Sequence, residues 1–213
     1  MMTIEEARVY YPANDPAHDF DHVLRVLALA LRLAERAGAD AEIVQTAALL
    51  HDTARPEEQA TGADHALQGA ARARQVLAGR MPAEKVEAVA QAIAAHRYRN
   101  ALVPQTLEAQ VLYDADKLDS IGAVGVARAY AIAGVCGQPL WAEVEPGYRR
   151  RKQAQAHHND LNAVHTPVHE FDFKLSQVAG TLFTPAAREI ARERHAYMVQ
   201  FFQRLAQEVH GQA

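Results

Sequence analysis

The sequence has little of several things, and each shortage excludes a class of protein. It contains one cysteine, Cys136, so no internal disulfide can form and a reducing compartment suits the chain. Aromatic residues make up 7% and β-branched runs are scarce, whereas the helix formers Ala and Leu are frequent. No apolar run reaches 18 residues, because Arg32 interrupts even "VLALALRLA". The segment "MMTIEEARVYYPAND" lacks a basic region followed by an apolar run, so we expect no signal peptide. These shortages predict an all-α cytoplasmic protein without a membrane segment.

Charge and length narrow the prediction further. The formal net charge is −4 with neutral histidine, which gives no general attraction to nucleic acid or to an anionic membrane. With 213 residues, 49% of them hydrophobic, the chain can bury a substantial core. No linker or composition shift marks a boundary. We therefore expect a single domain over residues 1–213, with a surface excursion at about 137–165, where apolar periodicity is low and one short helix would fit.

Apolar spacing and capping residues predict a series of helices. The first covers residues 20–37, with Val23, Leu27 and Leu31 on one face and Gly38 after its end. Asp40 and Asp64 stand where they can cap the next helices. The further helices are expected at about 41–51, 65–78, 82–96, 106–117, 166–180 and 185–208. The segment "PEEQATGAD" is interpreted as a polar loop.

Several of the eleven histidines fall at the ends of these helices. His22 is near the start of the first, and the His51-Asp52 doublet follows the apolar run "AALL". His96 ends the helix containing "VEAVAQAIAA" in the same way. A helix that buries its apolar face and ends in a polar residue brings that residue to the rim of the core.

Carboxylates follow in "LYDADKLDSIGAVG", which contains Asp114, Asp116 and Asp119. Asp116 and Asp119 are three residues apart and share a helix face, which Asp114 does not. A set of two imidazoles and two carboxylates suits divalent ions such as Mn²⁺, Fe²⁺, Co²⁺, Ni²⁺ or Zn²⁺. Donors on separate packed helices would form a preformed site.

The order of these residues resembles a known family. His22, then His51-Asp52, then Asp116 is similar to the H…HD…D signature of the HD superfamily of metal-dependent phosphohydrolases. The blocks "HDFDHVLRV", "AALLHD", "IAAH", "DADKLDSIGAVGVAR" and "ERHAYMVQFF" resemble a bacterial subgroup that includes nucleoside triphosphate pyrophosphohydrolases. The resemblance covers about residues 15–205 and implies a single-domain HD-type helical bundle.

The resemblance also implies roles for individual residues. The metal ligands would be His22, His51, Asp52 and Asp116, and Mn²⁺ is the first expectation, with Mg, Co, Ni, Fe or Zn open. Asp52 and Asp119 are the candidates for catalysis. Substrate contacts are assigned to His18, Arg25, Arg55, His96 and Lys174. His65 and His96 are the candidates for a second metal.

Structural explanations stand beside several of these roles. His96 could be a cation at a helix C-terminus, and Asp119 a solvated helix carboxylate. Arg25 could form a surface ion pair instead of holding a phosphate. The basic run at 149–152 is more usual as a solvated charge run than as a cover for a triphosphate.

The function implied by the resemblance is attack of a metal-activated water on a nucleotide phosphate. The expected reaction cleaves a (deoxy)nucleoside triphosphate to monophosphate and pyrophosphate. One alternative is an HD-type di-iron oxygenase, which needs His65 and His96 as additional ligands with Asp52 bridging. A second alternative is a non-catalytic signalling module of the same fold. The expected partner is a small nucleotide, without nucleic acid or membrane, and a homodimer is left open.

Overall fold

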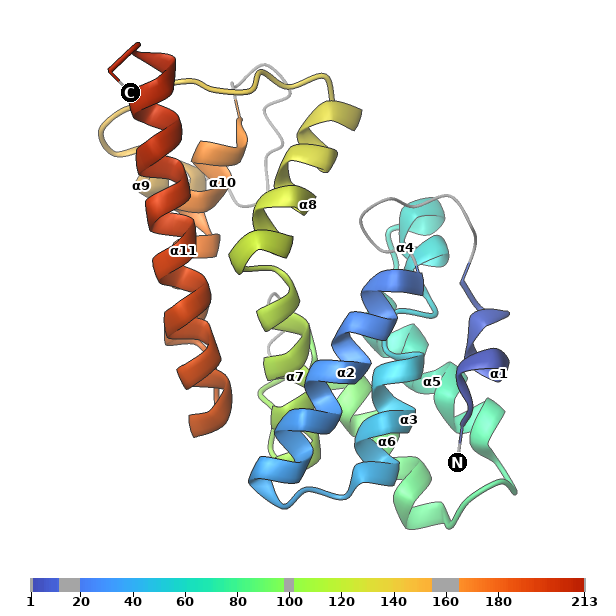
Figure 1. Cartoon of the computed structure of the whole chain (residues 1–213). Helices are drawn as coiled ribbons and strands as arrows, with labels where there is room; N and C mark the ends of the chain where they lie inside the picture. Colours follow the sequence, from blue (N-terminus) through green and yellow to red (C-terminus); the bar gives the residue numbers. More distant parts are fainter. Residues whose placement is uncertain (1, 12–19, 98–101, 155–164, 213) are drawn as a thin grey trace. The chain divides into compact units, whose positions relative to one another are not determined.

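The computed structural model describes residues 2–11, 20–97, 102–154 and 165–212, and every regular element in these ranges is helical (Figure 1). The chain divides into two compact units. The first comprises Met1–Asp119 and Leu182–Arg188, and the second comprises Ser120–Thr181 and Glu189–Ala213. The all-α prediction is confirmed. The assignment of residues 1–213 to one domain stays a prediction.

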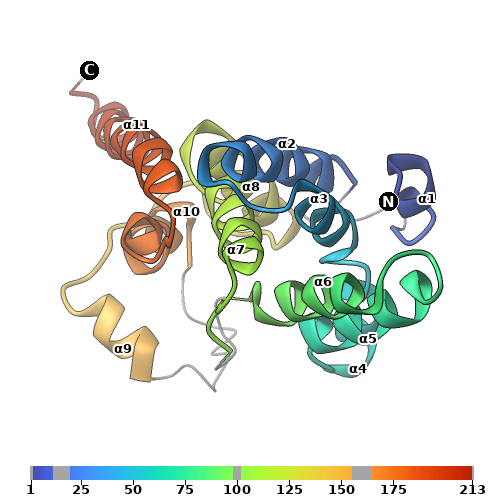
Figure 2. The same cartoon turned by 90° about the horizontal axis from the view of Figure 1, so that it is seen from below.

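The first unit is built from seven helices within the described residues. These are α1 (Ile4–Arg8), α2 (Phe20–Ala37), α3 (Ala41–Leu50), α4 (Arg55–Thr61), α5 (His65–Leu77), α6 (Ala83–Ala95) and α7 (Leu107–Asp119). α7 lies against α2, α3 and α6, α2 packs on α3, and α5 packs on α6 (Figures 1 and 2). The side chains between these helices form a closely packed apolar core, with fully buried members Leu33, Val44, Leu49, Leu50, Ile93, Leu112 and Leu118.

The helix boundaries follow the capping signals. Gly38 adopts a φ of 76°, a left-handed conformation that ends α2. The Asp40 carboxylate accepts from the amides of Glu42 and Ile43 at the start of α3. Asp64 caps α5 in the same way. The helices predicted at 20–37, 41–51 and 65–78 are therefore found within about one residue of their expected ends.

The polar loop predicted after Asp52 is wrong in part, because residues 55–61 form α4. Pro56 lies in its first turn, where a missing amide hydrogen costs no intrahelical bond. Gly62, at a φ of 75°, ends the helix. Polar composition hid this helix, although proline near the start and glycine past the end are the expected boundaries of a short one.

Asp114 has a structural role in the first unit. Its buried carboxylate accepts hydrogen bonds from the amides of Phe183 and Thr184 and from the Thr184 hydroxyl, all at 2.7–2.8 Å. These contacts fix the chain just before α11 (Pro185–Val209). The carboxylate is fully used there, in agreement with the prediction that Asp114 faces away from Asp116.

The second unit contains α8 (Gly122–Val135), α9 (Tyr148–Ala154), α10 (Pro167–Phe173), the 3₁₀ helix η1 (Leu175–Gly180) and most of α11. α10 contacts α8, α9 and η1, and the rings of Phe171 and Phe202 stack at 4.6 Å. The single helix expected at 166–180 is thus divided into α10 and η1. The short helix expected in the excursion is α9.

The described helices differ from membrane spans in length and hydropathy. No single helix there combines the length and the hydropathy of a membrane span, although α7 and α8 taken together would by length and composition. The cytoplasmic location stays a prediction.

Candidate metal centre

The candidate site lies where several helices of the first unit begin or end. α2 and α3 are joined only by residues 38–40, so the start of α2 and the end of α3 lie toward the same side. α5 and α6 are joined by residues 78–82 and form a second such pair. His22 comes from the first turn of α2, and His51 is the last-turn residue that caps α3. His65 begins α5 and His96 caps the end of α6.

One group of donors surrounds His22, and we call it the first half-site: His22, His51, Asp116 and the Oδ2 atom of Asp52. The Nε2 atom of His22 lies 3.3 Å from Nε2 of His51, 3.4 Å from Oδ1 of Asp116 and 3.8 Å from Oδ2 of Asp52. Nε2 of His51 is 3.6 Å from the same Asp52 oxygen. The four residues predicted as metal ligands are therefore brought together.

A second group shares the same aspartate, and we call it the second half-site: His65, His96 and the Oδ1 atom of Asp52. The Nε2 atoms of the two histidines are 3.3 Å apart. They lie 3.3 Å and 3.5 Å from Oδ1 of Asp52, respectively. The donor atoms of His22, His51 and Asp52 all lie within 4.8 Å of one another, and so do those of Asp52, His65 and His96. Because nitrogen and oxygen donors sit about 2.0–2.2 Å from a transition metal, each group is close to the size that one ion can span.

The Nδ1 atoms of all four rings, which face away from Asp52, form hydrogen bonds. Nδ1 of His22 lies 2.7 Å from the Asp119 carboxylate, and Nδ1 of His65 lies 2.8 Å from the Glu58 carboxylate. Nδ1 of His51 and of His96 donate to backbone carbonyls of their own helices, at 2.8 Å and 2.6 Å. Such oxygens only accept, so each Nδ1 carries a hydrogen and each Nε2 faces Asp52. This is how metal-binding histidines are oriented in proteins.

The Oδ2 atom of Asp52 indicates whether these residues fit a cation. Asp52 is buried, and within the described part of the chain its Oδ2 has no hydrogen-bond partner. Burying a carboxylate oxygen without a hydrogen-bond partner costs free energy. In addition, the lone pairs of four imidazole nitrogens directed at one carboxylate repel its negative charge unless a positive charge lies among them. The donor set therefore fits a divalent metal ion.

The carboxylates of the first half-site favour a proton on His22. Burial opposes the charged ring, but the carboxylates of Asp116 and Asp119 outweigh it and raise the pKa of His22 to about 9. Burial lowers the pKa of His51 to about 4. A cation entering the first half-site must therefore displace the His22 proton.

In the second half-site the pKa of His65 is lowered instead of raised. Burial, with a further contribution from Arg55 and His96, lowers the pKa of His65 to about 4. Burial also opposes the charge of Asp52, yet the surrounding His51 and His96 rings and Arg55 hold the pKa of its carboxyl well below the usual range. The shared carboxylate is thus ionised beside a neutral His65.

Asp119 and Arg25 form a pair behind the first half-site. The Arg25 guanidinium donates to both oxygens of Asp119, at 2.8 Å and 3.1 Å. Asp119 also accepts a hydrogen bond from Nδ1 of His22. Asp119 is buried, so the view of it as a solvated helix carboxylate is wrong. The catalytic role of Asp119 and the phosphate contact of Arg25 stay predictions.

The remaining predicted residues are distributed differently. Arg55 lies beside the second half-site, with Nε 3.1 Å from Oδ1 of Asp52. Lys174 belongs to the second unit, where it pairs with Glu170 at 3.1 Å. His18 lies outside the described residues. The substrate contacts assigned to these three residues stay predictions.

Sequence reasoning missed Glu58. It lies on α4, in the segment interpreted as a loop, and its carboxylate is the partner of His65. Arg97 also pairs with it at 2.9 Å. The available signal was the spacing from Arg55, since residues three apart on a helix are neighbours.

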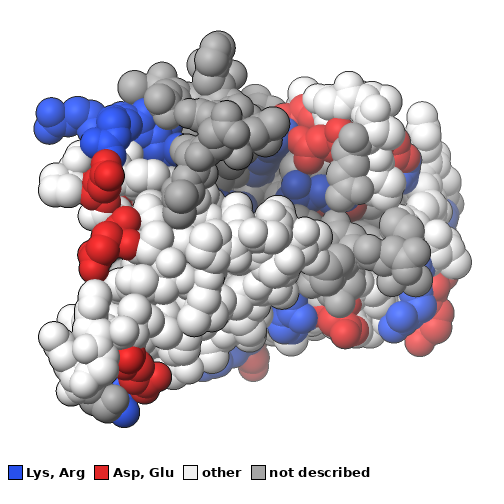
Figure 3. Space-filling model, turned by 90° about the horizontal axis from the view of Figure 1, so that it is seen from above, with Lys and Arg blue, Asp and Glu red and all other residues white. Residues whose placement is uncertain are grey.

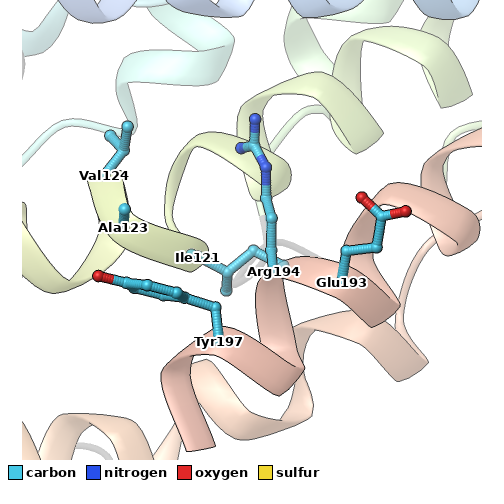
Figure 4. A pocket seen from close by; sticks show the side chains of 7 residues that line it. Ile121, Ala123, Val124, Glu193, Arg194 and Tyr197 are labelled. Carbon is cyan, nitrogen blue, oxygen red and sulfur yellow. The ribbon is translucent and has the colours of Figure 1, made fainter. Parts of the chain in front are cut away.

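The second unit has features of its own. The basic run 149–152 lies on α9, and a cluster of Lys and Arg side chains is visible in Figure 3. A pocket of about 300 Å³ is lined by residues 121–124 together with Glu193, Arg194 and Tyr197. Figure 4 shows the Tyr197 ring beside Ala123. The side chains of Glu193 and Arg194 extend away from this ring. None of the predicted site residues that the structure describes lines this pocket.

The chain is similar to known proteins, both to a family and to individual relatives. Residues 19–121 match the model of the HD domain family. A curated relative, the uncharacterized protein YpgQ of Bacillus subtilis (strain 168), is 33% identical over 201 residues. The match covers 91% of this chain and 85% of YpgQ.

Solved structures give the same result. The crystal structure of Bacillus subtilis YpgQ in complex with ADP is 28% identical with a TM-score of 0.71, and the match covers 99% of this chain and 100% of that one. A predicted HD superfamily hydrolase from an uncultured Thermotogales bacterium is 31% identical with a TM-score of 0.65, covering 96% and 88%. The His/Asp centre, the matched residues and the shared fold lead to one conclusion: this chain belongs to the HD domain family.

Proposed function

We propose that the protein is a metal-dependent phosphohydrolase acting on nucleotides, and that it cleaves (deoxy)nucleoside triphosphates to monophosphate and pyrophosphate. The observation that carries the proposal is the position of Asp52, whose two oxygens each face a pair of imidazole Nε2 atoms. Support for a nucleotide comes from the relative YpgQ, whose crystal structure contains ADP.

The ligands proposed for the first ion are His22, His51, Asp52 and Asp116. His65 and His96 are proposed to complete a second position with Asp52. A bound divalent ion lowers the pKa of its water and neutralises phosphate charge. Mn²⁺ is the first choice for the assay, because mixed imidazole and carboxylate donors suit it.

The chain's own residues supply orientation and charge. Asp119 and Glu58 hold the rings of His22 and His65 through their Nδ1 atoms. Arg25 and Arg55 are partly exposed, at 36% and 28% of their side chains, and so can reach phosphate oxygens while keeping their carboxylate partners. In the reaction, water attacks the α-phosphorus, the bond from that phosphorus to the oxygen bridging to the β-phosphate breaks, and pyrophosphate leaves.

The decisive experiment separates the products. Purified protein is incubated with Mn²⁺ and each nucleoside triphosphate, and monophosphate, diphosphate, phosphate and pyrophosphate are resolved by ion-exchange chromatography. We expect equal amounts of monophosphate and pyrophosphate, and loss of both in Asp52→Asn. Glu87→Gln, which alters an exposed ion pair with Arg74, is the matched control. Phosphate as the sole inorganic product would overturn the choice of bond, and no turnover with any nucleotide or metal would overturn the proposal.

The second half-site favours one further candidate, a di-iron oxygenase. Asp52 lies between two histidine pairs, which is the arrangement that two bridged irons require. Iron content and oxygen consumption distinguish the two activities. Two irons per chain and uptake of oxygen would support the oxygenase, whereas nucleotide turnover with Mn²⁺ and without oxygen uptake would exclude it.

A further inference from the structure

Arg55 occupies a particular position beside the second half-site. Its Nε donates to Oδ1 of Asp52 at 3.1 Å, and its Nη1 donates to Oε2 of Glu58 at 3.2 Å. Both acceptors also serve His65: Oδ1 of Asp52 is 3.3 Å from Nε2, and Oε2 of Glu58 is 2.8 Å from Nδ1. One guanidinium therefore neutralises the carboxylate that faces the second half-site and the carboxylate that supports it.

In the first half-site Arg25 likewise neutralises the supporting carboxylate, Asp119, but the carboxylate oxygens that face the half-site have different surroundings. Oδ2 of Asp52, which faces His22 and His51, has no hydrogen-bond partner among the described residues. Asp116 adds a second carboxylate, and although the Lys117 ammonium lies 2.5 Å from its Oδ2, the Oδ1 atom remains directed at His22. The first half-site thus offers more negative charge to a cation than the second, whose single carboxylate oxygen is shared with Arg55.

We propose that Arg55 makes the two half-sites unequal, so that the chain binds one divalent cation tightly and a second one at least tenfold more weakly. A positive guanidinium on Asp52 Oδ1 repels a cation held by the same oxygen, and this repulsion is strong where water is largely excluded. The inference rests on the proposed function in requiring a metal at this centre. It adds that a fixed residue of the chain determines how many ions are held.

The test measures metal binding directly. Isothermal titration of EDTA-treated, dialysed protein with MnCl₂ gives the affinity of each step, and electron paramagnetic resonance detects exchange coupling between two neighbouring Mn²⁺ ions. For the wild type we expect one tight and one weak step, with coupling only at high Mn²⁺. In Arg55→Gln the second step should tighten at least tenfold and coupling should appear at two equivalents.

Two control variants and a folding check accompany this titration. Arg55→Lys retains the positive charge and should keep the unequal steps. Arg74→Gln removes an arginine from an exposed pair with Glu87 and should leave both steps unchanged. Circular dichroism checks that each variant is folded, and if Arg55→Gln is not, Arg55→Met, which removes the charge but keeps most of the side-chain length, takes its place in the same titration.

The outcomes separate this inference from the proposed function. Two equal steps in the wild type, or an unchanged second step in folded Arg55→Gln, would overturn the role of Arg55 and leave the phosphohydrolase proposal intact. Failure of the wild type to bind any divalent ion would overturn both.

Discussion

The two half-sites around Asp52 are built from the same parts but differ in charge. Each has a pair of imidazoles whose Nε2 atoms are 3.3 Å apart, with one ring backed by a carboxylate and the other by a backbone carbonyl. The first half-site adds Asp116 and holds a proton on His22, whereas the second has Arg55 on the shared carboxylate. The comparison teaches that equal donor geometry does not mean equal affinity, because neighbouring charges decide how well a cation is held.

The largest effect is expected from removing what the half-sites share. Asp52→Asn should eliminate both Mn²⁺ binding steps and reduce nucleotide turnover to the level without metal. Mn²⁺ at about 100 times its Kd should stabilise the wild type by about 2.7 kcal/mol, roughly 5–10 °C in Tm for a chain of this size. Differential scanning calorimetry should show no such rise in Asp52→Asn. Asp172→Asn, at an exposed pair with Arg149, is the control, and a normal Mn²⁺-dependent rise in Asp52→Asn would contradict the shared role.

The next effect separates the half-sites by pH. Because the pKa of His22 is raised to about 9, the tight step must release a proton at pH 7. Its affinity should increase about tenfold from pH 7 to pH 8 and about 50-fold from pH 7 to pH 9, where half of the His22 rings have already lost the proton. The weak step should not change through this cause, since the pKa of His65 is lowered to about 4. Titration calorimetry in buffers of different ionisation enthalpy measures the protons released. A tight step that releases none would disprove the assignment of the proton to His22.

A third pair of variants addresses the carboxylates behind the rings. Asp119→Asn should weaken the tight step, and Glu58→Gln the weak step, each by about 10–100-fold, which is the usual effect of removing such a partner. Binding isotherms for Mn²⁺ report both. With saturating Mn²⁺, kcat separates the two roles of Asp119, and a value close to wild type would show that its oxygens, which Arg25 and His22 engage, only orient the ring. A kcat that stays at least 100-fold lower at saturation would instead establish Asp119 as the catalytic base.

The smallest effect concerns stability of the metal-free protein. The pKa values of His51 and His65 are lowered to about 4 in the fold, against 6.5 ordinarily. The unfolded chain therefore takes up more protons as the pH falls from 6.5 to 4, and stability is lost, by at most about 1.4 kcal/mol per pH unit for each histidine. His22 acts in the opposite sense, since its contribution is present below pH 6.5 and is lost as the pH rises through 9.

Urea denaturation of EDTA-treated protein at pH 7, 6 and 5 measures this dependence. The free energy of unfolding should decrease at each step, and His65→Gln should show a shallower decrease than the wild type. Stability that is flat or rising toward pH 5 would show that these rings are not held neutral.

Much of the first unit could be predicted from local signals. Apolar spacing and the caps at Gly38, Asp40 and Asp64 located α2, α3 and α5, because capping depends on residues only two or three positions away. Those signals also placed His51 and His96 at helix ends. The helix α4 was missed because its polar composition resembles a loop, and with it the partner of His65.

Contacts between distant residues were beyond local signals. The pairs His22–Asp119 and Arg25–Asp119 join residues 97 and 94 positions apart, and no spacing rule predicts them. The division of Asp52 between two histidine pairs depends likewise on how α2, α3, α5 and α6 pack. Resemblance to a family supplied the identities of the four predicted metal ligands, but not the hydrogen bonds that orient them.

Sequence alone determined the helical class, the helix ends and which residue types reach those ends, because helix formation and capping are decided within a few residues. Tertiary structure decided which nitrogen of each imidazole faces Asp52, which ring holds a proton and where Arg55 is placed. The physical reason is that ring orientation and pKa depend on atoms within a few ångströms in space, and packing brings those atoms from six different helices and the turn after α3.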